Sequence, residues 1–127
     1  MSQTVNYENL LQRLFDLDEH IRFAAVANMQ GNVVASVARD NVDLYLSPSE
    51  TQETIQHAIS AWKSRMKHYD KIGLGLYTLA VYEKLRRMTA PLPSGNLLLV
   101  TIDNMGGQKQ IVDKILNEVR FLDYTVS

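Results

Sequence analysis

Hydrophobic and polar residues recur along the chain with two different periods, and each change of period indicates a boundary between helix and strand. The first apolar positions have helical spacing: Tyr7, Leu10, Leu11, Leu14 and Phe15. They predict a short amphipathic helix with Asn6 as its N-cap. The acidic run at 16–19 is expected to end this helix.

Two apolar runs come next, at about 21–28 and 32–39, around the stretch HIRFAAVANMQGNVVAS (20–36). We expect two antiparallel strands joined by a tight turn, because Gly31 tolerates the positive φ that such a turn needs. The hairpin contains no nucleophile paired with a base and no set of metal ligands, so we expect it to have a structural role rather than a catalytic one.

The clearest helix start is the capping box Ser47-Pro48-Ser49-Glu50, with Ser47 as N-cap and Pro48 as the first helical residue. This second helix is expected to run to about Tyr69. One of its stripes is apolar and is predicted to pack on a sheet: Thr51, Ile55, Ala58, Ile59, Trp62, Met66 and Tyr69.

Strand-like runs follow at 73–81, 85–92 and 96–103, with short turns at 82–84 and 93–95. Short turns make neighbouring strands antiparallel. With the opening hairpin, these runs predict a five-stranded antiparallel sheet.

A closing helix is predicted from about Gly106-Gly107, capped by Asp103 or Asn104. Its apolar face comprises Ile111, Val112, Ile115, Leu116, Val119 and Leu122. The order α-β-β-α-β-β-β-α indicates a single α+β domain over residues 1–127, with helices packed on the sheet.

Composition narrows the possible functions. A net charge of −1 gives no general attraction to nucleic acid or to an anionic membrane, and the absence of cysteine excludes disulfides and thiolate chemistry. No apolar run approaches the roughly 20 residues that span a bilayer. The opening MSQTVNYENL lacks the basic and apolar regions of a signal peptide. We therefore expect a cytoplasmic protein without membrane contact.

The element order, together with the QGNVVAS hairpin (30–36) and the NLLLVTID strand (96–103) before a helix, resembles the roadblock/dynein-light-chain family, a relative of profilin-like and longin scaffolds. The resemblance covers about residues 5–122. It implies a homodimer, formed through the second helix and the third strand with the sheets joined edge to edge, that is a platform for small GTPases or motor components. The stretch YEKLRRMTAPLPSGNLLLVTID (82–103) is also similar to a group of small archaeal proteins, which implies little about function.

The residues themselves also favour a dimer. A second stripe of the second helix is small and semi-polar: Thr54, His57, Ala61, Ser64, Arg65 and His68. Small residues let two helices approach closely, and the run at 73–81 is apolar on both faces, as in an edge strand covered by a partner. The alternative is the solvated flank of a monomer. The predicted interface comprises Thr54, His57, Ala58, Ala61, Arg65, His68, Leu74, Leu76 and Tyr77.

Candidate chemistry is sparse, and we expect no catalytic residue, metal or cofactor. His57 and His68 would share a helix face about 16 Å apart, too far to bind one ion, although their protonation near pH 6 would loosen a dimer seam that contained them. The segment NMGGQKQ (104–110) could hold a small anion with Lys109, but a plain strand-to-helix turn is the simpler interpretation.

Positive charge concentrates in residues 63–87, where seven Lys and Arg against two acidic residues give +5. Cations near a helix C-terminus also complement its dipole without any partner. A partner-binding basic patch is predicted at Lys71, Lys84, Arg86 and Arg87.

We therefore expect a non-enzymatic homodimeric scaffold or regulatory module that binds a protein partner, such as a small GTPase. The alternatives are a profilin-like sensory domain with a small molecule between sheet and helix, and a weak nucleic-acid binder through residues 63–87.

Overall fold

The computed structural model describes residues 6–40 and 42–125, with side chains described up to Val119. The elements are α1 (Tyr7–Leu17), β1 (Ile21–Ala27), β2 (Val33–Ala38), α2 (Pro48–Met66), α3 (Tyr69–Ile72), β3 (Thr78–Val81), β4 (Leu85–Pro91), β5 (Leu97–Asp103) and α4 (Gln108–Thr125). The strands of this part of the chain form an antiparallel sheet of five in the order β2-β1-β5-β4-β3. The predicted α+β fold is confirmed.

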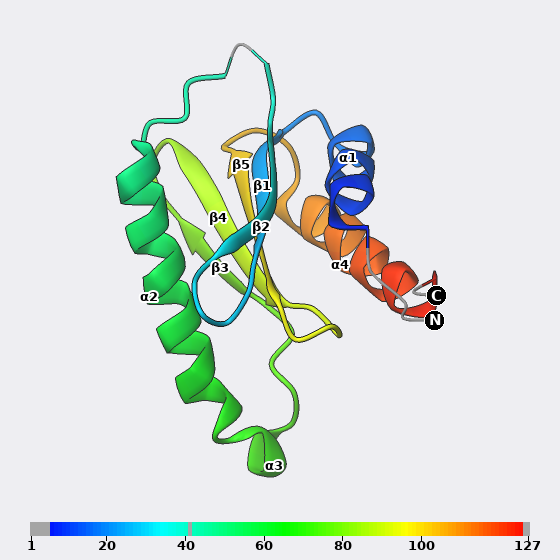
Figure 1. The fold of residues 1–127 in the computed structure, drawn as a ribbon. Helices are drawn as coiled ribbons and strands as arrows, with labels where there is room; N and C mark the ends of the chain where they lie inside the picture. Colours follow the sequence, from blue (N-terminus) through cyan, green and yellow to red (C-terminus); the bar gives the residue numbers. More distant parts are fainter. Residues whose placement is uncertain (1–5, 41, 126–127) are drawn as a thin grey trace.

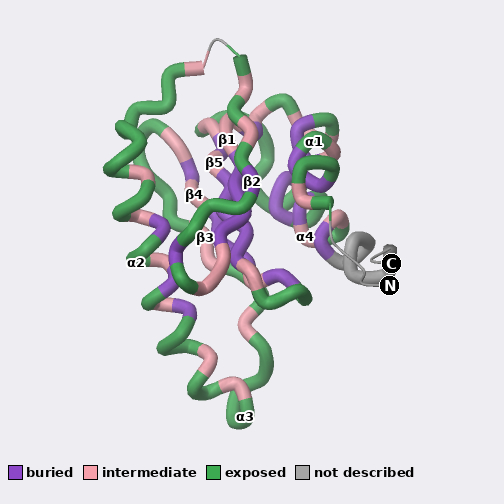
Figure 2. The backbone as a smooth tube through the Cα atoms, viewed as in Figure 1, coloured by how far each residue is buried: buried purple, intermediate pink, exposed green. Residues whose placement is uncertain are grey.

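The sheet is covered on both faces: α1 and α4 pack on one, and α2 lies along the other (Figure 1). Successive side chains of the central strand β5 point to opposite faces of the sheet, so this strand contributes apolar residues to the core on both faces. Leu98, Val100 and Ile102 join the larger core beneath α1 and α4. Leu97 and Leu99 face α2, and the buried residues run through the middle of the molecule (Figure 2).

Local signals place the first two helices. The Asn6 side chain accepts the Asn9 N–H at 3.0 Å. At α2, Ser47 Oγ accepts the Glu50 N–H at 3.1 Å, and Glu50 Oε1 accepts the Ser47 N–H at 2.9 Å, so the predicted capping box is confirmed. The hydrogen bonds from Ser47 hold the pKa of the Glu50 carboxyl below its ordinary value.

One predicted helix end and one predicted helix cap are wrong. The helix α2 ends at Met66 rather than near Tyr69, and the short α3 follows. The closing helix begins at Gln108, and its first hydrogen bond runs from the Ile111 N–H to the Gly107 carbonyl, so neither Asp103 nor Asn104 caps it. The predicted contribution of Leu122 to its apolar face lies outside the described side chains.

The third predicted strand is shorter than expected. Residues 73–77 are not a strand, and β3 comprises only Thr78–Val81. Gly73 has a φ of 91°, and a Cβ placed on Gly75 would lie 2.5 Å from Trp62 Cζ3. The segment therefore bends at one glycine and packs tightly against α2 at the other, which prevents it from continuing the β3 ladder.

Candidate functional site

Two hydrogen bonds fix how α2 faces the sheet. Arg87 Nη2 on β4 donates to Thr54 Oγ1 at 2.9 Å, whereas Gln52 Nε2 donates to the Gly31 carbonyl in the β1–β2 turn at 2.6 Å. One side of the helix therefore faces the β4–β3 end of the sheet. At 100° per residue, that side carries what we call the α2 flank: Thr54, Ala58, Ala61 and Arg65.

The outer edge of β3 has no strand partner within residues 6–40 and 42–125. Apolar side chains are exposed on and just before this strand, and we call them the β3 edge: Leu74, Leu76, Tyr77 and Val81. Leu74 is 75% exposed and Val81 is 65% exposed. Exposed apolar side chains that gather in one place, unlike scattered ones, mark an interaction surface.

A buried polar chain holds β3 next to α2. Trp62 Nε1 donates to Thr89 Oγ1 on β4 at 2.8 Å, and Thr89 Oγ1 lies 2.6 Å from Thr78 Oγ1 on β3. The α2 flank and the β3 edge therefore lie at the same end of the sheet, as the predicted interface requires. Of the two predicted histidines, His57 is exposed on α2, but His68 lies beyond its end, so the two do not share a helix face.

The predicted basic patch is not one surface. Arg86 is only 5% exposed, and its guanidinium donates to the Asp103 carbonyl at 2.8 Å and to the Met105 carbonyl at 2.6 Å. Its inclusion in the patch is therefore wrong, because β4 directs it into the protein interior. Lys71 lies on α3, past the C-terminus of α2, while Lys84 lies near the N-terminus of α2. Since α2 is about 28 Å long, these two lysines belong to different ends of the molecule.

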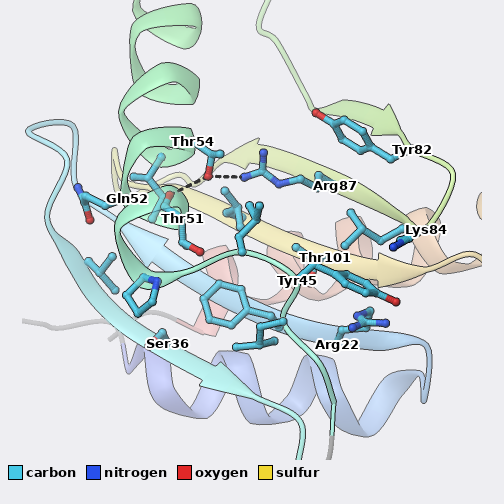
Figure 3. A pocket seen from close by; sticks show the side chains of 18 of the residues that line it. Arg22, Ser36, Tyr45, Thr51, Gln52, Thr54, Tyr82, Lys84, Arg87 and Thr101 are labelled. Atoms are coloured by element: carbon cyan, nitrogen blue, oxygen red, sulfur yellow. Dashed lines mark hydrogen bonds between the residues drawn. The ribbon is translucent and has the colours of Figure 1, made fainter.

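A cavity of about 1010 Å³ separates the first half of α2 from the sheet, and we call it the α2 cavity (Figure 3). Its walls come from four strands, from α2, and from two connections at residues 44–46 and 82–84. Apolar side chains dominate the interior, among them Phe23, Leu85 and Leu99. A small molecule between sheet and helix is predicted from the sequence only as an alternative function, and no motif in the chain predicts which residues line this space.

Polar groups lie at two places in the α2 cavity. Arg87 points toward Thr54 on the α2 side, and Thr101 lies directly opposite Arg87 on β5 (Figure 3). At the other end, the guanidinium of Arg22 lies 4.7 Å and the ammonium of Lys84 5.2 Å from the ring centre of Tyr45. This arrangement suits binding of a ligand more than bond cleavage, because no nucleophile–base pair is among these groups.

Other candidate chemistry receives little support. Within the described part of the chain, no three His, Asp or Glu side chains are placed to hold a metal ion. Lys109, in the predicted anion-binding turn, is paired with Asp113 at 2.7 Å, which raises the pKa of its ammonium. None of the helices described here is long and apolar enough to cross a membrane.

A further polar tie joins α1, β1 and α4. The Asp18 carboxylate accepts the His20 N–H at 2.9 Å and lies 3.1 Å from Lys114 Nζ. Burial raises the pKa of Asp18, but these two partners outweigh it and hold the pKa below its ordinary value of 3.8.

No protein-family model matches the sequence, and no curated protein matches it either. Solved structures do match in fold. A roadblock/LC7 domain from Streptomyces avermitilis is 13% identical with a TM-score of 0.69, covering 97% of each chain. The gliding protein MglB from Thermus thermophilus is 10% identical with a TM-score of 0.69, covering 91% of this chain and 86% of that one.

A third match extends the likeness to profilins. LokiProfilin1, solved in complex with rabbit actin, is 13% identical with a TM-score of 0.54, covering 96% of this chain and 97% of that one. At these identities the likeness concerns the fold alone, but it spans nearly the whole chain in each case. The chain has a roadblock/LC7 fold, which is also similar to that of a profilin, as the order of its elements predicts.

Proposed function

We propose that the chain is a non-enzymatic homodimeric module that binds a protein partner. The observation that carries the proposal is the open β3 edge beside the α2 flank. An unpaired strand with exposed apolar side chains pairs readily with another strand. A second copy that joined its β3 to this one would cover Leu74, Leu76 and Val81 and would continue the sheet across a two-fold axis.

The α2 flank fits the same arrangement. Ala58 and Ala61 lack the long side chains that would keep a facing helix away. Arg65 is stacked on Trp62, with its guanidinium carbon 4.9 Å from the ring centre, so its charge lies back along the helix rather than projecting from it. Ala61 of one protomer would then lie near Ala61 of the other.

We infer the kind of partner from other proteins that have the same fold. Structures that share it include one described as MglB with a tetrameric arrangement and a profilin bound to actin, so the fold serves assembly with other proteins in those cases. We propose the same kind of role here, with a small GTPase as the first partner to test. Retention of a GTPase on immobilised wild-type chain, loaded with GTP or with GDP, measures that step separately from dimerisation.

Sedimentation equilibrium tests the dimer. The wild type should have twice the mass of the 14.4 kDa chain at micromolar concentration. Ala61→Arg would place two facing cations at the seam and should weaken association by about a hundredfold or more. Ser60→Arg is the matched control, because Ser60 is exposed and lies about 100° around α2 from Ala61, outside the α2 flank, so the mass should stay unchanged. A monomeric wild type, or an Ala61→Arg variant as dimeric as its control, would refute the proposal.

A further inference from the structure

We propose that the α2 cavity is a binding site for a small molecule with an apolar body and a single carboxylate group. The proposal is independent of the dimer, because the cavity uses the first half of α2, from Pro48 to Ile55, whereas the predicted seam is centred on Ala61. Of the α2 flank, only Thr54 also lines the cavity.

The size and lining of the cavity suit one small molecule. Its volume of about 1010 Å³ is at the upper end of the range of roughly 300–1,000 Å³ that is typical of ligand sites. The sheet forms the floor through Phe23 and Leu99, and Ile55 of α2 forms one wall. Such sites are mostly apolar and contain a few polar groups that orient the ligand, which is the pattern seen here.

The sheet itself is adapted to the cavity at Arg22. In the β1–β5 ladder, Ile21 pairs with Ile102 but Phe23 pairs with Thr101, so Arg22 is an extra residue in a β-bulge. The bulge breaks the alternation of β1, and both Arg22 and Phe23 line the cavity. A regular strand would direct one of these two side chains to the opposite face of the sheet.

Charge selects an anion. The cavity lining contains three cations, Arg22, Lys84 and Arg87, against one carboxylate, Glu83, which leaves a net charge of +2. The rest of the lining is neutral. The positive charge of the lining therefore attracts a ligand with a single negative charge and repels a cationic ligand.

The anchor for the carboxylate is the pair Arg87 and Thr101. These residues are directly opposite each other on β4 and β5, which places their Cβ atoms about 4.5–5.5 Å apart. Arg87 uses one nitrogen for Thr54, and within the described residues its other N–H groups and the Thr101 hydroxyl have no hydrogen-bond partner. A guanidinium fork next to a hydroxyl matches the two oxygens of a carboxylate.

The far end of the cavity is lined by Tyr45, whose ring lies between Arg22 and Lys84 (Figure 3). Tyr45 has a φ of 36°, and no other non-glycine residue in the described ranges has a positive φ. Such a conformation persists where the surroundings hold it, and here two cations flank the ring. The Tyr45 ring is thus held in place at this end of the cavity, where it limits the length of the ligand's apolar body.

Binding of 1-naphthaleneacetate, with the uncharged isostere 1-naphthaleneacetamide as its comparison, tests the proposal by ¹H–¹⁵N NMR titration and calorimetry. The carboxylate should saturate below about 1 mM and bind about tenfold more tightly than the amide. Its shift perturbations should centre on Thr101, Arg87 and Ile55. Arg87→Met should remove the tenfold preference while leaving the amide's affinity unchanged. Lys63→Met, at an exposed position of α2 outside the cavity and outside the α2 flank, should change neither.

Ser36→Trp provides a second variant that does not depend on Arg87. Ser36 is exposed on β2 and lines the cavity, so the indole should fill the space and abolish binding of both probes without unfolding the sheet. Failure of both probes to saturate, equal affinity for carboxylate and amide, or perturbations centred away from the cavity would overturn the proposal. A Ser36→Trp variant that became monomeric would also overturn it, because the cavity would then be covered by a second copy.

Discussion

Replacing Thr89 with valine should loosen β3, the strand on which the proposed dimer depends. Thr89 is 9% exposed, and its hydroxyl is the only group that joins the indole N–H of Trp62 to Thr78 among the described residues. Valine has nearly the same shape but no acceptor. Trp62 is 1% exposed, so its N–H would be left without a partner in the protein interior.

The magnitude follows from the partners that are lost. A buried donor left unsatisfied costs about 1–3 kcal/mol, and the second hydrogen bond to Thr78 adds about 0.5–1 kcal/mol. Thr89→Val should therefore lower the free energy of unfolding by about 1.5–4 kcal/mol. Thr78→Val leaves the Trp62–Thr89 bond intact and should cost about 1 kcal/mol or less.

Urea denaturation at one fixed protein concentration measures both values, since dimerisation would make stability depend on concentration. Hydrogen exchange at the amides of β3 should accelerate more in Thr89→Val than in Thr78→Val. If Thr89→Val stays within about 0.5 kcal/mol of the wild type, or if Thr78→Val costs as much, the polar chain does not anchor the strand.

Three other substitutions test separate parts of the structure. Arg86→Met should cost about 2–4 kcal/mol in urea denaturation, because the carbonyls of Asp103 and Met105 lose a charged donor that is itself buried. Lys71→Met, exposed on α3, should stay within about 0.5 kcal/mol, and equal effects would contradict the buried role of Arg86. Asp18→Asn should cost about 0.5–1 kcal/mol at pH 7. The pKa of Asp18 is lower in the folded chain than its ordinary value of 3.8, so the stability difference between wild type and Asp18→Asn should be constant above pH 3.8. The difference should vanish as the pH falls through the folded pKa. A stability difference that persisted below the folded pKa would contradict the ion pair. Gly75→Ala should cost about 1–3 kcal/mol by overpacking, and should shift the emission of Trp62, the only tryptophan in the chain; unchanged emission would show that the segment before β3 does not press on α2.

Strongly periodic segments could be predicted from the sequence because their burial follows a simple geometric rule. The α2 stripe with Ile55, Ile59 and Trp62 is buried as the helical spacing predicts. Signals that rest on local hydrogen bonds, such as the Ser47 capping box, were equally reliable. These features depend on residues only a few positions apart, so no tertiary information is needed to find them.

Features that depend on distant parts of the chain could not be predicted. Arg86 was predicted to be a surface cation, but it donates to one carbonyl in the last residue of β5 and to another just beyond it, and only the fold brings these groups together. The run before β3 was apolar enough to be predicted as a strand, yet Gly73 and Gly75 mark an irregular segment whose apolar side chains are exposed. The α2 cavity depends on a bulge at Arg22 and on the path of residues 42–46, neither of which has a distinctive sequence pattern.

Cysteine cross-linking at Ala61 tests the central claim most directly, because the natural chain contains no cysteine and a single one reports only contact between copies. A disulfide forms when the two Cα atoms lie within about 4.4–6.8 Å of each other. Under mild oxidation, Ala61→Cys should give a covalent dimer in high yield. Ser60→Cys, which lies about 100° around α2 from Ala61 and outside the α2 flank, should remain largely uncross-linked. Equal yields from the two variants, or no dimer from Ala61→Cys, would contradict a dimer built on the α2 flank and the β3 edge.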